Sequence, residues 1–591
     1  MERFMRIHYP ISLSTLRRAS MATTFRLLLT AAAFAISSPA ANAQTVVPTN
    51  ANPTCTVSGP EFSNWFASGM IVANGIVDPA DSVTFPNMPN CSFYKWSEQM
   101  FLWLTSPAPS KYGPGSHVFN SPVFYDLSLA DQTTGLRTLV PNTSGRIRDF
   151  SARISQLGPN HKPVVFDHTG KMFNVVRPEL SPNARPLIRN RADQPVEIQR
   201  VEVGADSKPV FLDRAGKAID FKAAQNGAPV LHDHLGNTLN LQLSKTLLNG
   251  KPFFIDQFGN AVPTEQGQAD GNVLMTQNGT LVYYALQVND VYAYFLTGQK
   301  DGAIMATTFP TTPAALNSIV AFGLAHSKAF PDANALAIEL KSAWIETTGL
   351  DTSKYVTMTA TIPTYNKTPT QWTVSGSTQA QLALVGMHVV GSAAGHPEMI
   401  WATFEHVNNT RNAQYTYTNN ANPGVTVTVP QDNGGTWTFS STPPAAPADQ
   451  NQPLLSVSGL NIVAANPPTP IGPSDIFRVN PWGKPGNSTA SNTEVISINH
   501  SVISQLANND VRKNYIMTGA TWTIGGAPPS GNNQVGTNMM ANTTMESFFQ
   551  PSNCFFCHQG DMLGVMAGPP PTPPVGDGLS HVYGPIKPLF P

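Results

Sequence analysis

The chain has 591 residues, a formal net charge of −1 and only 12% charged residues. This balance argues against the basic surfaces that bind nucleic acid or anionic membranes. With 52 prolines and 44 glycines, the composition favours short strands joined by turns over long surface helices. We therefore expect a mainly β protein, a β-rich α+β fold with a large multi-segment body.

The N-terminus has the pattern of an export signal. Arg26 precedes an apolar run over residues 27–36, and Ala41-Asn42-Ala43 follows as a small-x-small cleavage site. The run is too short to cross a bilayer and no later stretch reaches 18 apolar residues, so we expect no membrane span. We expect residues 1–43 to be a signal peptide cleaved after Ala43 and the mature protein to be periplasmic or secreted. Met21 offers a second start, so translation of residues 1–20 stays open.

The mature chain divides at changes of pattern into an N-terminal segment, a repeat region, a β-rich core, a linker and a C-terminal segment. The linker is predicted from its many Pro, Ala and Asn residues. The expected bounds are, in the same order, residues 44–150, 151–285, 286–440, 441–475 and 476–591.

The N-terminal segment contains Cys55 and Cys91, which we expect to form a disulfide in an oxidising compartment. Closing this 36-residue loop would stabilise the protein by roughly 3–4 kcal/mol. Residues 91–104 carry large apolar side chains at intervals of three and four, which predicts an amphipathic helix that ends before Pro107.

The repeat region contains an internal repeat of strand, Asp-x-x-Gly turn and second strand, in which glycine supplies the positive φ. One hairpin cannot bury its own face, so we expect the units to stack into a sheet or short solenoid. The four full copies begin at Pro163, Pro209, Pro229 and Pro252, and a degenerate copy begins at Pro186.

The core region has two kinds of pattern. In residues 333–344, apolar residues recur four apart from Leu336 to Trp344, which predicts a short helix, although the alternation over 338–341 also suits the start of a strand. Residues 355–440 alternate Thr, Val and Tyr between Pro and Gly, which predicts antiparallel sheet. Farther on, we expect two helical pieces and one strand at residues 499–506, 508–515 and 521–523.

The most informative motif is the C-x-x-C-H pattern Cys554-Phe555-Phe556-Cys557-His558. Two thiols at this spacing can each form a thioether to a haem vinyl group, and the histidine that follows can ligate the iron. A Cys554–Cys557 disulfide or redox dithiol and half of a zinc site are the alternatives. A zinc site would require two further Cys or His ligands, and the sequence contains no second pair at such a spacing.

The motif resembles that of c-type cytochromes, and this part of the chain resembles exported bacterial cytochrome c-like proteins. The resemblance covers five residues directly. It implies one covalent haem c bound by Cys554 and Cys557, with His558 as the proximal ligand of the haem iron. It also implies an exported protein, because haem c is attached outside the cytoplasm, and electron transfer with a periplasmic redox partner that the sequence does not identify.

The distal ligand of the iron is not fixed by the sequence. Small c-type domains place a methionine ligand some tens of residues after the motif, but here Met562 and Met566 follow too closely and few residues remain. The ligand, if there is one, should come from earlier in the chain or from the tail. The candidates are His406, Met545 and His581, and beyond these Met539, Met540 and His500.

A second group of polar residues lies on a predicted strand over residues 396–406. Alternation places His396, Glu398 and His406 on one face and Trp401 and Glu405 on the other. Two histidines and a carboxylate are transition-metal ligands, but the histidines lie roughly 33 Å apart in a straight strand and cannot share a metal. We expect polar residues within a sheet here, with a distal-ligand or acid–base role for His406 and a metal site as the alternatives.

Three functions follow from these patterns. The first is a periplasmic single-haem protein that transfers electrons. The second is a haem-dependent oxidase-like or peroxidase-like enzyme with an open distal site, in which His406 and Glu405 or Glu398 handle a small substrate. The third is an exported binding or surface protein that uses the hairpin repeats. If the protein is an enzyme, its catalytic residues cannot be named from the sequence.

Overall fold

In this computed structural model all described residues belong to one compact unit within residues 41–591, and the expected signal peptide lies outside the described residues. They are residues 45–86, 88–128, 136–143, 148–150, 164–166, 172–174, 187–197, 200–203, 209–213, 215–222, 231–232, 238–239, 273–421, 425–441, 451, 454–458, 461–464, 468–483, 488–529, 533–537, 539–547, 550, 554–558, 579–580, 583 and 586–590.

In the described part of the chain, twelve strands form one sheet: β1 (Phe124–Leu127), β2 (Leu139–Pro141), β3 (Arg148–Asp149), β12 (Val282–Asn289), β13 (Ile338–Glu346), β14 (Thr357–Lys367), β15 (Gln371–Ala393), β16 (His396–His406), β20 (Leu455–Ser458), β21 (Asn461–Ala464), β23 (Tyr515–Thr523) and β24 (Gln534–Gly536). Eight of them follow in the order β2-β1-β12-β13-β15-β16-β23-β24, each antiparallel to its neighbours. β14 and β21 also pair with β15, and β3 pairs with β14 in parallel. The mainly β prediction is confirmed.

The α-helices of the described residues are α1 (Gly59–Trp65), α2 (Asn90–Leu104), α4 (Asp290–Lys300), α5 (Pro313–Ala325), α6 (Thr489–Gln505) and α7 (Cys554–Cys557). α2 confirms the predicted helix, and its aromatic side chains are core residues: Phe101 stacks on Phe404 and Phe93 on Trp522, with ring centroids 4.2 and 3.9 Å apart. In the chain as described, no helix is both long and apolar enough to span a bilayer.

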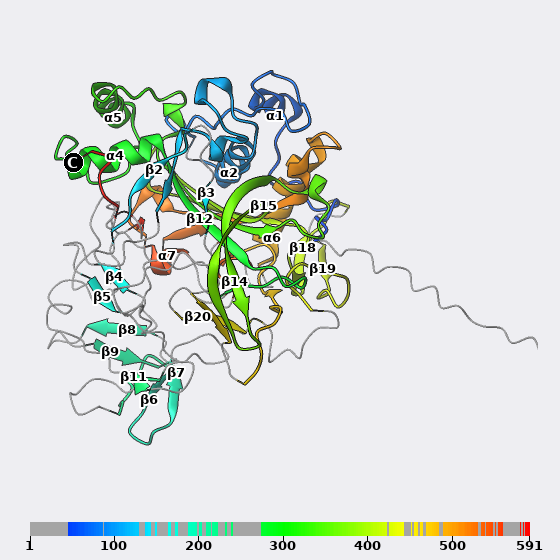
Figure 1. The fold of residues 1–591 in the computed structure, drawn as a ribbon. Coiled ribbons are helices and arrows are strands. Elements are labelled where there is room, and N and C mark those ends of the chain that lie inside the picture. Colours follow the sequence, from blue (N-terminus) through cyan, green and yellow to red (C-terminus); the bar gives the residue numbers. More distant parts are fainter. Residues whose placement is uncertain are drawn as a thin grey trace, which may run out of the picture. The chain divides into compact units, whose positions relative to one another are not determined.

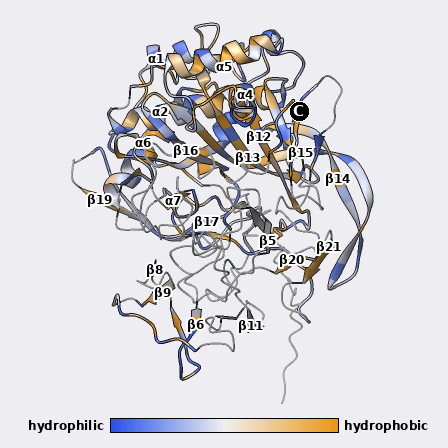
Figure 2. Ribbon diagram, turned by 90° about the vertical axis from the view of Figure 1, so that its left-hand side faces the viewer, coloured by the Kyte–Doolittle hydropathy of each residue, from blue (hydrophilic) through white to orange (hydrophobic). Residues whose placement is uncertain are grey.

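The two faces of the sheet carry different parts of the chain. Figures 1 and 2 show α2 on one side of the central strands and α7 on the other. On the first side, Phe404 of β16 meets α2. On the second side, Trp401, also of β16, contacts the ring of Phe555 in α7, with the ring centroids 6.0 Å apart. The strands between them are covered on both faces, and the residues of β12 and β16 are accordingly buried almost throughout.

The prediction of a helix over residues 333–344 was wrong. The alternative interpretation, a strand, is correct for most of this range. A 3₁₀ turn at Ala333–Ala335 precedes β13, which lies between β12 and β15 and is hydrogen-bonded to both. Burial on two faces explains the apolar residues that mimic a helical period. Within the predicted linker 441–475, the hairpin β20–β21 adds to the end of the long strand β15.

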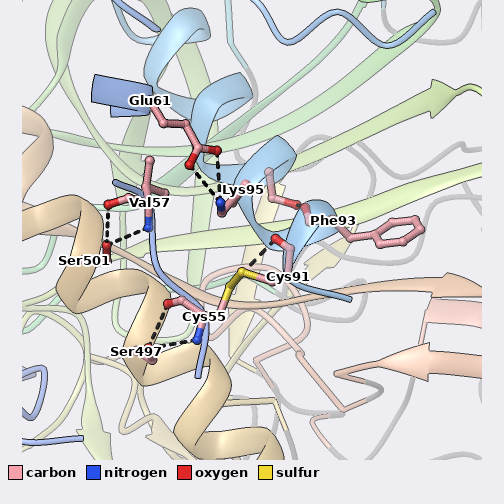
Figure 3. The surroundings of a disulfide bond; sticks show 9 residues. Cys55, Val57, Glu61, Cys91, Phe93, Lys95, Ser497 and Ser501 are labelled. Atoms are coloured by element: carbon pink, nitrogen blue, oxygen red, sulfur yellow. Dashed lines mark hydrogen bonds and ion pairs between the residues drawn. A yellow bond between two sulfur atoms is a disulfide. The ribbon is translucent and has the colours of Figure 1, made fainter. Parts of the chain in front are cut away.

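The predicted disulfide between Cys55 and Cys91 is formed, and it ties the N-terminal segment to the start of α2. Figure 3 shows the same segment running along α6. The hydroxyl of Ser497 accepts from the N–H of Cys55 and donates to its carbonyl, at 3.1 and 2.8 Å. Ser501 bonds both backbone groups of Val57 in the same way. Two serines one turn apart thus satisfy alternate residues of an extended strand.

The described parts of the repeat region are hairpins: β4 (Val164–Phe166) with β5 (Met172–Asn174), β6 (Leu187–Arg189) with β7 (Pro195–Glu197), β8 (Arg200–Val203) with β9 (Pro209–Leu212), and β10 (Leu231–His232) with β11 (Thr238–Leu239). In the turn after β9, Asp213 accepts from the N–H groups two and four residues on, and Gly216 has φ +74°. The degenerate copy makes the same turn with Asn190 as the acceptor and Asp193 at φ +64°. The fourth full copy lies outside the described residues.

Two further two-stranded sheets occur among the described residues. They are the pairs β17 (Arg411–Asn412) with β22 (Phe477–Arg478) and β18 (Tyr415–Thr418) with β19 (Thr426–Val429). The helix predicted near residues 499–506 is the end of α6, residues 508–515 contain a 3₁₀ turn, and the strand predicted at 521–523 is the end of β23.

Candidate functional site

The segment that precedes the C-x-x-C-H motif is held on the sheet by a buried carboxylate. Glu405 of β16 is fully buried and accepts hydrogen bonds from the backbone N–H of Thr543, at 2.8 Å, and from its hydroxyl. Arg478 forms an ion pair with the same carboxylate, at 2.6 Å. Because a buried carboxylate without partners is very costly, these groups stabilise one position of the segment.

Asn542 fixes the neighbouring residues. Its side-chain amide donates to the hydroxyl of Thr403 and to the carbonyl of Phe404, both at 3.0 Å, and its amide oxygen accepts from the N–H of Thr544. The close approach requires a glycine on the sheet: a Cβ on Gly386 would lie 2.3 Å from the Thr544 hydroxyl. Residues 542–544 thus form a turn packed directly against β15 and β16.

The motif itself is a single helical turn. α7 covers Cys554–Cys557, and the N–H of His558 donates to the carbonyl of Cys554 at 2.9 Å. Cys554 is partly buried and is not part of a disulfide. Burial, with a smaller contribution from the Glu546 carboxylate, raises the pKa of its thiol to about 12. The thiol is therefore protonated at neutral pH, unlike the low-pKa thiolates of redox or nucleophilic cysteines.

The orientation of His558 is set by two contacts. Its Nδ1 lies 2.7 Å from the carbonyl oxygen of Leu579. Since a carbonyl can only accept, Nδ1 carries the proton, and in the neutral ring Nε2 would have the lone pair that a metal ligand needs. On the sheet side, the ring of Trp401 lies 4.2 Å from the imidazole, centroid to centroid. A histidine ligand whose other ring nitrogen donates to a carbonyl is the usual arrangement at metal sites.

A histidine–carboxylate pair that the sequence analysis did not single out lies beside the motif. His388 of β15 lies 3.1 Å from the carboxylate of Glu546, and both side chains are largely buried. Burial alone would raise the pKa of Glu546, but His388 and Lys341 outweigh it and lower that pKa. Lys341, His388 and Thr403 are directly paired across β13, β15 and β16, so they form one row on this face of the sheet.

His406, a candidate distal ligand, lies on the opposite face. Its ring contacts Tyr355 and Tyr515, on the side of the sheet that meets α2. Nε2 donates to the carbonyl of Lys354 at 3.1 Å, and Nδ1 accepts from the N–H of Asn408 at 3.2 Å. Burial lowers the pKa of His406 to about 3, so the ring is neutral. The structure does not bring His406 to the motif.

Two of the other candidates, Met545 and Met540, lie in the apolar cluster that contains part of the motif. The side chain of Met545 is fully buried in this cluster, which also contains Trp401 and Phe555. The sulfur of Met540, in the same cluster, accepts from the hydroxyl of Thr537 at 3.7 Å. His500 lies on α6, which packs against α2. His581, Met562 and Met566 lie outside the described residues.

His396 and Glu398 form a buried pair on the α2 side, with Nδ1 2.8 Å from the carboxylate. The ring of Phe93 meets His396 edge-on, and the N–H of Thr523 donates to the same carboxylate oxygen. The pair is far along the strand from His406, as the predicted spacing required. Among the described residues, no three His, Cys, Asp or Glu side chains are grouped so as to hold a metal ion.

The residues present are compatible with a haem c attached through the motif. The test is the donor set itself: a thiol on one helical turn, a histidine with its proton fixed on Nδ1, and the aromatic rings of Trp401 and Phe555 as apolar neighbours. No family model, no curated protein and no solved structure matches this chain.

Proposed function

We propose that this chain is an exported single-haem protein of the c type that transfers electrons. Cys554 and Cys557 bind the porphyrin through thioethers, and Nε2 of His558 ligates the iron. The observation that carries the proposal is the C-x-x-C-H motif on one helical turn together with the hydrogen bond from Nδ1 of His558 to the Leu579 carbonyl. That hydrogen bond supports the tautomer that an iron ligand requires.

The chain contributes surroundings as well as ligands. When bound, the haem would supply a one-electron couple. Trp401 and Phe555 present apolar surface beside His558, and removal of water from this side would favour the less charged ferrous form. The carboxylate of Glu546, close enough to Cys554 to raise its pKa, lies 3.1 Å from Nε2 of His388. Met545, fully buried in the apolar cluster that contains Trp401 and Phe555, is our candidate for the sixth ligand.

Export is supported by two observations. The Cys55–Cys91 disulfide is typical of an oxidising compartment, and the N-terminal sequence has the signal pattern described above. The partner in this proposal is a periplasmic protein that exchanges single electrons with the haem. Weak redox complexes of this kind have small interfaces.

The test is to express the chain in a host that exports proteins and attaches haem c. We expect the unfolded, solvent-extracted polypeptide to keep its colour and to exceed the mass of the bare chain by one haem. The double variant C554S/C557S should lose both, whereas C55S/C91S, which removes the same number of cysteines elsewhere, should keep the haem. A colourless wild-type protein with the mass of the bare chain would refute the proposal.

The same preparation separates electron transfer from catalysis at an open site. A low-spin spectrum unchanged by carbon monoxide or peroxide indicates two axial ligands and supports electron transfer. If Met545 is the second ligand, M545A should convert the spectrum to high spin, while M540A should leave it low-spin. A wild-type protein that is high-spin and binds these ligands would instead favour the oxidase-like or peroxidase-like alternative.

A further inference from the structure

The carbonyl that orients His558 belongs to a segment near the C-terminus. We define the C-terminal strap as the described residues 579–580, 583 and 586–590. The N–H of Leu589 donates to the hydroxyl of Thr297, and Lys300 donates to the carbonyl of Tyr583, at 3.1 and 2.9 Å. Both partners belong to α4. The strap is therefore fixed to a buried helix several residues beyond the point where it meets His558.

The first part of the strap is held by a buried serine. Ser580 is 2% exposed. Its hydroxyl donates to the carboxylate of Glu339 on β13, at 2.6 Å, and accepts from the phenol of Tyr292 on α4, at 2.8 Å. A serine hydroxyl has one hydrogen and two lone pairs, so both hydrogen bonds form at once. Ser580 joins the sheet and α4 through a single side chain.

Ser580 lies one peptide bond from the contact with His558. The carbonyl of Leu579 and the nitrogen of Ser580 belong to the same peptide unit, which is planar and rigid. A side chain that fixes the backbone of Ser580 therefore restricts the direction of the Leu579 carbonyl. This carbonyl receives the proton on Nδ1 of His558, at 2.7 Å.

We propose that Ser580 is a positioning residue: held by Glu339 and Tyr292, it directs the Leu579 carbonyl at His558 and so sets the orientation and basicity of that imidazole. The inference rests on the proposed function, because its consequence concerns the haem iron. A strong hydrogen bond to Nδ1 makes the imidazole a better donor and stabilises the ferric state. Weakening this bond should raise the reduction potential.

The test compares three variants of the exported protein by haem content and by potentiometric titration. S580A removes both hydrogen bonds, Y292F removes one, and Y583F removes a phenol elsewhere on the strap, where it bonds Gln299. At a fixed solution potential, we expect S580A to raise the ferrous-to-ferric ratio by up to about tenfold, the size seen for partners of metal ligands. Y292F should show a smaller rise and Y583F none. S580T, which keeps a hydroxyl, should restore the wild-type potential.

The outcomes distinguish this inference from the proposed function. Wild-type protein without covalent haem would overturn both. Full haem content in every variant, with S580A and Y583F at the wild-type potential, would overturn the positioning role alone. If S580A does not fold, the other two variants still decide the question. A reduction potential of Y292F above that of wild type, with Y583F equal to wild type, supports the positioning role. Equal reduction potentials for Y292F and wild type refute it.

Discussion

At the scale of single residues, Glu405 is the buried carboxylate that holds the segment before the motif on the sheet. Its carboxylate and the Arg478 guanidinium are both essentially unexposed. E405A would leave the arginine without this carboxylate and the Thr543 N–H without its acceptor. We expect a loss of about 3–5 kcal/mol in the free energy of unfolding, measured by denaturant titration. E61A, which breaks the partly exposed pair of Glu61 with Lys95, should cost less than about 1 kcal/mol. Similar losses in the two variants would contradict this assignment.

His406 should make stability depend on pH. Burial lowers its folded-state pKa to about 3, against an ordinary value of 6.5. The unfolded chain therefore binds a proton first as pH falls, and stability is lost progressively below about pH 6.5, down to about pH 3. At pH 5 this one residue should account for about 2 kcal/mol relative to neutral pH. Denaturant titrations at pH 7.5 and 5 should show a smaller decrease for H406N than for wild type. Equal decreases would mean that His406 does not titrate in this way.

At the scale of elements, β15 separates two packing surfaces. A Cβ on Gly386 would lie 2.3 Å from Thr544, in the segment that leads to the motif. A Cβ on Gly391 would lie 2.9 Å from Trp96 of α2, on the other face. Each Gly→Ala substitution should cost about 1–3 kcal/mol through overpacking. In hydrogen-exchange measurements, G386A should show faster exchange than wild type at the amides of residues 539–558. G391A should show faster exchange than wild type at the amides of α2. The same pattern in both variants would contradict the division into two faces.

The disulfide between Cys55 and Cys91 ties the N-terminal segment to α2. Cys55 and Cys91 close a 36-residue loop, so C55S/C91S should lose about 3–4 kcal/mol. Serine at both positions avoids a free thiol. Thermal unfolding of the wild type with reductant should approach that of the variant, and the variant should not respond to reductant. A variant as stable as the oxidised wild type would show that the N-terminal segment is held by Ser497 and Ser501 alone.

Elements with a clear local period were predictable, whereas pairings between strands were not. The aromatic spacing of residues 91–104 defined α2 to within one residue at its start. The four-residue spacing of Leu336, Leu340 and Trp344 suggested a helix, although the alternation over residues 338–341 belongs to the strand that the structure has, and beyond it β13 is buried at successive residues. His388 was missed for a related reason. Its significance depends on a register that places it beside Lys341 and opposite Glu546, and no signal within residues 387–393 specifies those neighbours.

At the scale of the whole molecule, the site is assembled from parts far apart in the sequence. The motif at residues 554–558 rests on β16, its flanking turn is held by Glu405, and its histidine meets the C-terminal strap. The proposed haem chemistry is predicted from the motif alone, because the motif is local in the sequence. The partners that orient it come from several segments, and only the folded chain brings them together. Whether the sequence-derived division into six segments describes independent folding units stays a prediction.

The connectivity of the sheet predicts that the repeat region is an insertion. β1 and β12 are hydrogen-bonded neighbours, yet the repeats lie between them in the sequence. β3, which precedes the repeats, pairs with β14, which follows them. The chain segments before and after residues 151–272 thus belong to one sheet. The entropic cost of closing a flexible connection depends only weakly on its length, so a shorter connection is tolerated.

Replacing residues 153–270 with a Gly/Ser linker should therefore preserve cooperative unfolding and, if the proposed function is right, the covalent haem. Circular dichroism and the haem spectrum check this, with an equal-length replacement of residues 339–345, within β13, as the control that should not fold. Loss of cooperative unfolding in the first variant would show that the repeats are part of the core rather than an addition to it.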